Sequence, residues 1–135
     1  MPAEQVPSTD GRRACILVVD DEPLVAAVMA DTLGLGGYEV ETAKNGREAL
    51  EKIAGSSYDV ILSDLRMPEL DGVGLYRDLE QQHPRLLPRL AFVSGTTDPP
   101  EYASFLERTG ATILSKPFAV ANLLQLVQRL LQGHQ

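Results

Sequence analysis

The sequence of 135 residues contains no tryptophan, few other aromatic residues and a single cysteine. One cysteine cannot form an intrachain disulfide, and because Cys15 lies in an apolar run we expect an inert core thiol. With so few aromatic side chains, a core must be built mainly from leucine, valine, isoleucine and alanine. At 44% hydrophobic residues, a chain of this length is expected to form one domain around one core.

Positive charge is also scarce. Lysine and arginine number 12 against 19 aspartates and glutamates, which gives a formal net charge of -7. Binding to nucleic acid or to an anionic membrane needs clustered positive charge, so neither is expected. No apolar stretch approaches the ~18 residues of a membrane span, and the first residues lack the apolar segment of a signal peptide. We therefore expect a cytoplasmic protein without membrane insertion.

Short apolar runs alternate along the chain with segments of helical periodicity. Strands are expected over residues 14–19, 38–42, 58–62, 89–93 and 111–114. Helices are expected over residues 23–33, 45–54, 70–82, 99–109 and 119–131, the fourth of them capped by Asp98. This alternation predicts an α/β fold, a single doubly wound sheet of five parallel strands with helices on both faces. Residues 14–131 would form this domain, with a disordered tail or linker at 1–13 and a short tail at 132–135.

Polar residues follow the carboxyl ends of four of the predicted strands. They are Asp20, Asp21, Asp64, Ser94 and Lys116. The carboxyl ends of parallel strands meet at one edge of a sheet, where open α/β folds bind their ligands. Three carboxylates crowded there would repel one another unless a cation is present, and a few oxygen ligands suit Mg2+. With Lys116 as a second positive charge, this edge predicts a phosphoryl site in which Asp64 is the nucleophile and Ser94 donates a hydrogen bond.

Over residues 14–131 the chain resembles the receiver domain of two-component response regulators. The resemblance rests on four segments in their usual order, residues 18–22, 63–72, 93–95 and 116–118. It implies a flavodoxin-like (βα)5 fold with strand order 2-1-3-4-5. Residues 105–110 are similar to receivers attached to hybrid histidine kinases, so both a single-domain regulator and a fragment of such a kinase remain open.

The resemblance also implies a role for each residue at the predicted site. Asp64 would accept a phosphoryl group from a histidine kinase or a histidine phosphotransfer domain, and the domain would assist its own phosphorylation without being an enzyme. The Mg2+ ligands would be Asp20, Asp21, Asp64 and the backbone carbonyl of Arg66. Ser94 and Lys116 would bind the phosphoryl group, and the Lys116–Pro117 peptide bond would be cis.

One position departs from the family pattern. The switch position three residues before Lys116, where the family usually has tyrosine or phenylalanine, holds Ile113. A β-branched side chain without a polar tip gains little from a rotation, so we expect Ile113 to stay buried in one rotamer. Any switching should then come from residues 94–96 and from the start of the helix at Asp98.

Rival functions remain open at this stage. Nothing after Leu131 is expected to form an output domain, so the domain could signal through a surface or act as a phosphate sink without an output partner. A homodimer through the fourth helix, fifth strand and fifth helix is also left open. A small phosphatase-like enzyme is disfavoured, because Arg66 and Pro68 stand where a second acid would be needed.

Overall fold

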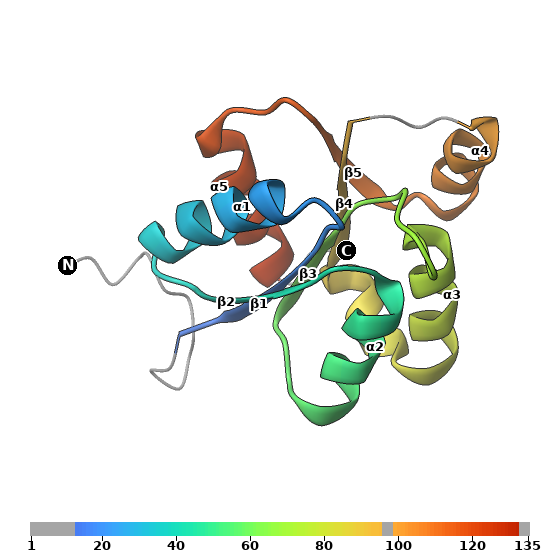
Figure 1. Cartoon of the computed structure of the whole chain (residues 1–135), viewed down its shortest axis with the longest axis horizontal. Coiled ribbons are helices and arrows are strands. Elements are labelled where there is room, and N and C mark those ends of the chain that lie inside the picture. Colours follow the sequence, from blue (N-terminus) through green and yellow to red (C-terminus); the bar gives the residue numbers. More distant parts are fainter. Residues whose placement is uncertain (1–12, 96–98, 133–135) are drawn as a thin grey trace.

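The computed structural model describes residues 13–95 and 99–132. Their strands form one parallel sheet in the order β2-β1-β3-β4-β5, which confirms the predicted fold (Figure 1). The strands are β1 (Cys15–Val19), β2 (Glu39–Ala43), β3 (Val60–Ser63), β4 (Leu90–Ser94) and β5 (Thr112–Ser115). The predicted tails lie almost entirely outside the described residues, so their boundaries stay a prediction.

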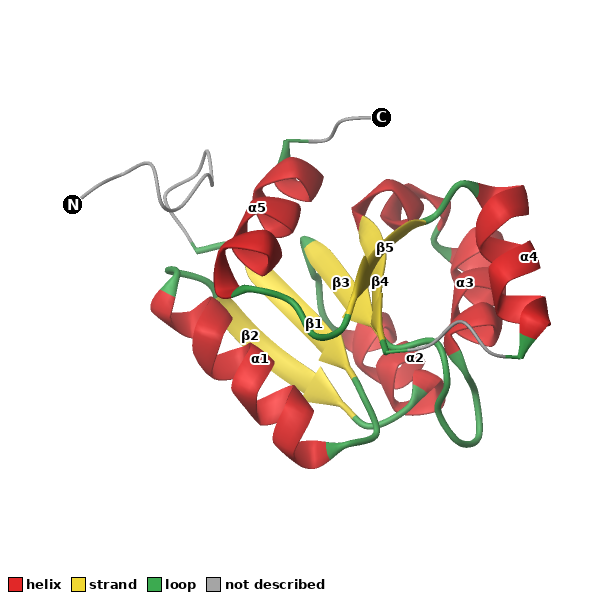
Figure 2. Ribbon diagram, turned by 90° about the horizontal axis from the view of Figure 1, so that it is seen from above, coloured by secondary structure: helices red, strands yellow, loops and turns green. Residues whose placement is uncertain are grey.

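Helices cover both faces of this sheet (Figure 2). The helices α1 (Pro23–Leu35) and α5 (Val120–Leu131) pack on one face, in a core cluster that includes Leu33 and Leu123. The helices α2 (Gly46–Gly55), α3 (Gly72–Gln82) and α4 (Pro100–Thr109) pack on the other face. Within residues 13–95 and 99–132, every helix is too short or too polar to span a bilayer.

The strand β3 is the centre of the sheet, and it positions the candidate site. Its four residues are all buried, and it pairs with β1 on one side and β4 on the other. Successive side chains point to opposite faces, so Val60 and Leu62 enter the core beneath α1 and α5 while Ile61 enters the other core. Because both faces of the sheet are covered, the strand is apolar up to Leu62 and buried along its whole length. Pairing on both sides fixes β3 in the sheet and therefore fixes the position of Asp64, the residue that follows it.

Local features that differ from the sequence-based expectations include the start of α4 and a short additional helix. The helix α4 begins at Pro100, and Pro99 takes the cap position that was predicted for Asp98, which itself lies outside the described residues. The reason is that Pro99 precedes another proline, which disfavours helical geometry and holds Pro99 extended at ψ 171°. A 3-10 helix, η2 (Pro84–Arg89), was not predicted, and it joins α3 to β4.

Candidate phosphoryl and metal site

Four strand ends converge at one edge of the sheet. Asp20 follows β1, Asp64 follows β3, Ser94 ends β4 and Lys116 follows β5. The backbone holds them in register, since the Asp64 N–H donates to the Val19 carbonyl at 2.9 Å and the Lys116 N–H donates to the Ser94 carbonyl at 2.9 Å. Residues that are far apart in the sequence therefore form one compact polar cluster.

Asp64 lies between donors on two sides. Its Oδ1 accepts hydrogen bonds from the Leu65 N–H and from the Ser94 hydroxyl, each at 2.7 Å. Its Oδ2 lies 3.5 Å from the Lys116 Nζ. The Asp64 side chain is 13% exposed, so the carboxylate is fixed in orientation while it remains reachable from solvent.

Lys116 makes its closest ion pair with Asp20 and not with Asp64. Its Nζ lies 2.9 Å from Asp20 Oδ2, while Asp20 Oδ1 accepts a hydrogen bond from the Glu22 N–H at 2.9 Å. Partial burial acts to lower the pKa of Lys116, but the hydrogen bond to Asp20 and the charges of Asp64 and Asp20 outweigh it and leave this pKa raised. Lys116 is therefore held in its charged form against two carboxylates.

Three aspartates could hold a metal ion. Asp20, Asp21 and Asp64 each offer a carboxylate oxygen, and these atoms lie within 4.8 Å of one another. Asp21 is exposed, and a hollow of about 370 Å3 opens beside Asp20 and Asp21. An all-oxygen set with one open side fits Mg2+, which binds through a few carboxylates and keeps several waters.

The segment that joins β3 to α3 packs closely against the backbone of Asp64. Asp71 caps α3, because its Oδ1 accepts a hydrogen bond from the Gly74 N–H at 2.9 Å. Gly72 donates its N–H to the Leu65 carbonyl at 2.8 Å, and a Cβ at Gly72 would lie only 2.7 Å from the Asp64 carbonyl oxygen. Glycine is needed here because the backbone at Gly72 lies directly against that of Asp64.

Two further expectations concern the strand β5 and the bond that follows it, namely the burial of Ile113 and the cis Lys116–Pro117 peptide bond. Ile113 pairs with Phe92 across the sheet and packs against the core beneath α3 and α4. It is only partly buried, because it lies in the edge strand β5, so the expectation that Ile113 is buried was wrong. That it keeps one rotamer stays a prediction. The cis Lys116–Pro117 bond is confirmed.

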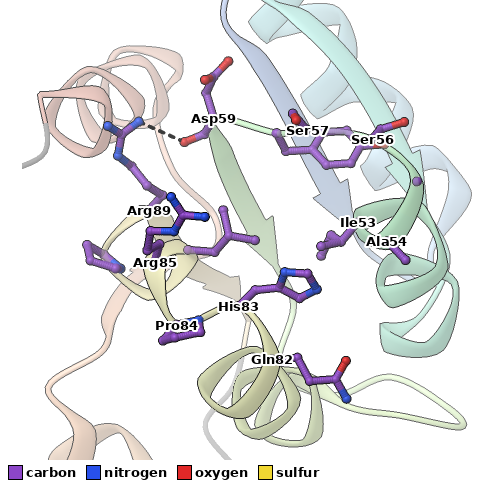
Figure 3. A pocket seen from close by; sticks show the side chains of 14 residues that line it. Ile53, Ala54, Ser56, Ser57, Asp59, Gln82, His83, Pro84, Arg85 and Arg89 are labelled. Carbon is purple, nitrogen blue, oxygen red and sulfur yellow. Dashed lines mark hydrogen bonds between the residues drawn. The ribbon is translucent and has the colours of Figure 1, made fainter.

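A second hollow in the described part of the chain lies away from this cluster. It has a volume of about 1050 Å3 and is lined by residues that include Asp59, His83 and Arg85 (Figure 3). Tyr58 also lines it. Tyr58 and Asp59 precede β3, whereas Asp64 follows it, so the strand separates the two places. None of the predicted site residues lines this hollow.

Comparison with known proteins gives the family. Residues 16–128 match the family described as the response regulator receiver domain. The chain is 33% identical over 124 residues to the DNA-binding transcriptional regulator NtrC of Escherichia coli, a match that covers 92% of this chain. The chain belongs to the response regulator receiver family. Members of this family are phospho-accepting domains of two-component signalling systems, and that is the role of this receiver.

Solved structures of receivers share its fold. The receiver domain of a signal transduction histidine kinase from Syntrophus aciditrophicus has a TM-score of 0.77 and 34% identity, covering 89% of this chain and 91% of that one. The response regulator TrrA of Thermotoga maritima, solved in complex with Mg2+ and beryllofluoride, has a TM-score of 0.76 and 30% identity, covering 87% of this chain and 98% of that one. The present chain spans about a quarter of the length of NtrC, so DNA binding is a property of that longer protein.

Proposed function

We propose that Asp64 is the phosphoryl acceptor of this receiver domain. The observation that carries the proposal is the position of its carboxylate, with the Ser94 hydroxyl 2.7 Å from Oδ1 and the Lys116 ammonium 3.5 Å from Oδ2. These are the donors that a phosphoryl group on Asp64 would need around it, because phosphoryl transfer depends on positioning and charge neutralisation.

The donor that fits this site is a phosphohistidine on a histidine kinase or a histidine phosphotransfer domain. An Asp64 oxygen attacks the phosphorus atom and an O–P bond forms. The P–N bond breaks, and the electron pair of that bond returns to the imidazole nitrogen. Ser94 and Lys116 then bind the oxygens of the transferred phosphoryl group. Mg2+, held by Asp20, Asp21, Asp64 and the Arg66 carbonyl, would neutralise phosphoryl charge.

The experiment is phosphorylation by acetyl phosphate with Mg2+, followed by mass spectrometry of the intact chain. The wild type should gain one phosphate, and Asp64→Asn should gain none. Asp31→Asn, which changes an exposed aspartate on α1, is the matched control and should be phosphorylated like the wild type. Equal phosphorylation of Asp64→Asn and the wild type would overturn the assignment.

A phosphate sink is the second candidate, and Ile113 favours it because this side chain has no polar tip to move between two environments. The two functions differ in whether phosphorylation moves α4, β5 or α5, the surface where a homodimer or an output partner would bind. Of the predicted switching region, Ser94 and Gly95 are described, whereas residues 96 and 98 lie outside the described residues. NMR spectra with and without beryllofluoride distinguish the candidates, since a sink should show shifts only around Asp64.

A further inference from the structure

The hydroxyl of Tyr102 connects α4 to the segment that carries Asp64. Tyr102 is 8% exposed, and its hydroxyl donates a hydrogen bond to Asp71 Oδ2 at 2.9 Å. One turn further along α4, Phe105 makes edge-on ring contacts with Tyr76 of α3 and Phe92 of β4. Phe105 packs α4 through apolar contacts, which tolerate small shifts, whereas the hydrogen bond of Tyr102 weakens steeply with distance and angle.

Asp71 links this hydrogen bond to the backbone around Asp64. Its other oxygen caps α3 at the Gly74 N–H, so both carboxylate oxygens have partners. The next residue, Gly72, donates to the Leu65 carbonyl at 2.8 Å, and the Leu65 N–H in turn donates to Asp64 Oδ1 at 2.7 Å. A continuous series of short contacts therefore runs from α4 to the phosphoryl acceptor.

A second connection reaches α4 from the same carboxylate. Ser94 donates its hydroxyl to Asp64 Oδ1, and the chain then passes from Ser94 to the start of α4 at Pro100. The helix α4 therefore follows Ser94 along the chain and is hydrogen-bonded through Tyr102 to Asp71. Phosphorylation of Asp64 changes the carboxylate that the Ser94 hydroxyl and the Leu65 N–H now contact, so it acts on both connections between α4 and the acceptor.

We propose that the Tyr102–Asp71 hydrogen bond holds α4 in its unphosphorylated position and is broken when Asp64 is phosphorylated. This inference rests on the proposed function. Ile113 offers no hydroxyl for such a role, so the polar contact that senses the site is supplied by α4. Because linkage is reciprocal, a bond that is lost on phosphorylation must also oppose phosphorylation.

The test measures binding of beryllofluoride, a phosphoryl mimic, by NMR titration with beryllium at fixed fluoride and Mg2+. Tyr102→Phe keeps the ring and removes only the hydroxyl, so its half-saturating beryllium concentration should fall about three- to tenfold. Tyr58→Phe is the matched control. It removes another buried hydroxyl, bonded to Glu41 at 2.6 Å near the opposite end of the sheet, and should leave half-saturation unchanged.

A second variant changes Asp71, which accepts the hydrogen bond from Tyr102. Asp71→Ser keeps a good helix cap but shortens the side chain away from Tyr102, so it should lower half-saturation by a similar factor. The double variant Tyr102→Phe, Asp71→Ser should show no further decrease, because both changes remove the same bond. In the wild type, the 13Cζ resonance of Tyr102 should shift on beryllofluoride binding while that of Tyr58 should not.

The outcomes separate this inference from the function on which it rests. The role of the Tyr102–Asp71 bond would be overturned if the half-saturating beryllium concentration of Tyr102→Phe lay within twofold of the wild-type value. It would also be overturned if this variant bound beryllofluoride more weakly than the wild type. A wild type that neither binds beryllofluoride nor accepts phosphate would instead overturn the proposed function, and the inference with it.

Discussion

Lys116 is the residue on which the charge balance of the site depends. Its ammonium contacts a buried carboxylate, Asp20, and a partly buried one, Asp64. Without Lys116 the two would face each other uncompensated, and losing one partner of such a pair leaves a buried charge alone. The arrangement therefore stabilises the fold as well as preparing the site.

Lys116→Met should lower the free energy of unfolding by about 2 kcal/mol, less than for a fully buried pair because the Lys116 side chain is 20% exposed. Urea unfolding at neutral pH measures this difference. Lys44→Met, at an exposed lysine, is the control and should change stability by less than about 0.5 kcal/mol. Equal stability of Lys116→Met and the wild type would contradict the role of this ion pair.

At the scale of elements, the join between β3 and α3 depends on close backbone approach. In Gly72→Ala the new Cβ would meet the Asp64 carbonyl oxygen at 2.7 Å and the Leu65 Cα at 2.9 Å. Backbone atoms cannot move aside as a flexible side chain can, so this substitution should cost about 2 kcal/mol or more.

Gly34→Ala is the matched substitution within a helix. Nothing lies within 4 Å of a Cβ at Gly34, near the end of α1, so alanine should stabilise the protein by about 0.5–1 kcal/mol through helix propensity. Thermal and urea unfolding of the two variants measure both effects. The account of the β3–α3 join would be wrong if the two substitutions changed stability in the same direction.

The whole molecule should lose stability at alkaline pH. All four tyrosines have a raised pKa, chiefly because burial disfavours the phenolate, and for Tyr102 burial and the hydrogen bond to Asp71 raise the pKa to about 12. An unfolded tyrosine loses its proton near pH 10. The stabilisation is therefore present below pH 10 and is lost as pH rises from about 10 to about 12.

Unfolding free energy measured across this range should fall with pH, and Tyr102→Phe should make the fall less steep because one group with a raised pKa is removed. Absorbance of the phenolate gives an independent measurement, since few tyrosines should ionise before the fold is lost. Ionisation of all four near pH 10 with the fold intact would contradict this prediction.

Metal binding should also be visible as stability of the whole fold. Three carboxylates share the site with one lysine, so Mg2+ should relieve their repulsion. At tenfold above its dissociation constant, Mg2+ should add about 1.4 kcal/mol. The melting temperature should rise with millimolar Mg2+ in the wild type and in Asp31→Asn but not in Asp21→Asn. An unchanged wild-type melting temperature would argue against the site.

The fold and the grouping of the polar residues at the strand ends could be predicted from the sequence. Each apolar run such as 58–62 ends at a polar residue, and in a parallel sheet all these ends lie at one edge, so Asp20, Asp64 and Lys116 could be grouped without coordinates. Local rules placed every α-helix end within two residues. The helix α3 begins at Gly72 and not at residue 70, and α4 begins at Pro100 and not at residue 99, where two prolines follow each other.

How these side chains pair could not be predicted, because it depends on distances between packed elements. Lys116 lies closer to Asp20, 96 residues away, than to Asp64, and Tyr102 reaches Asp71 across 31 residues. Local periodicity reports which face a residue occupies, but the reach of a side chain depends on how neighbouring elements pack. The edge position of β5 likewise left Ile113 partly exposed. The partners of Lys116 and Tyr102 depend on the distances between packed elements, and a local sequence pattern holds no information on those distances.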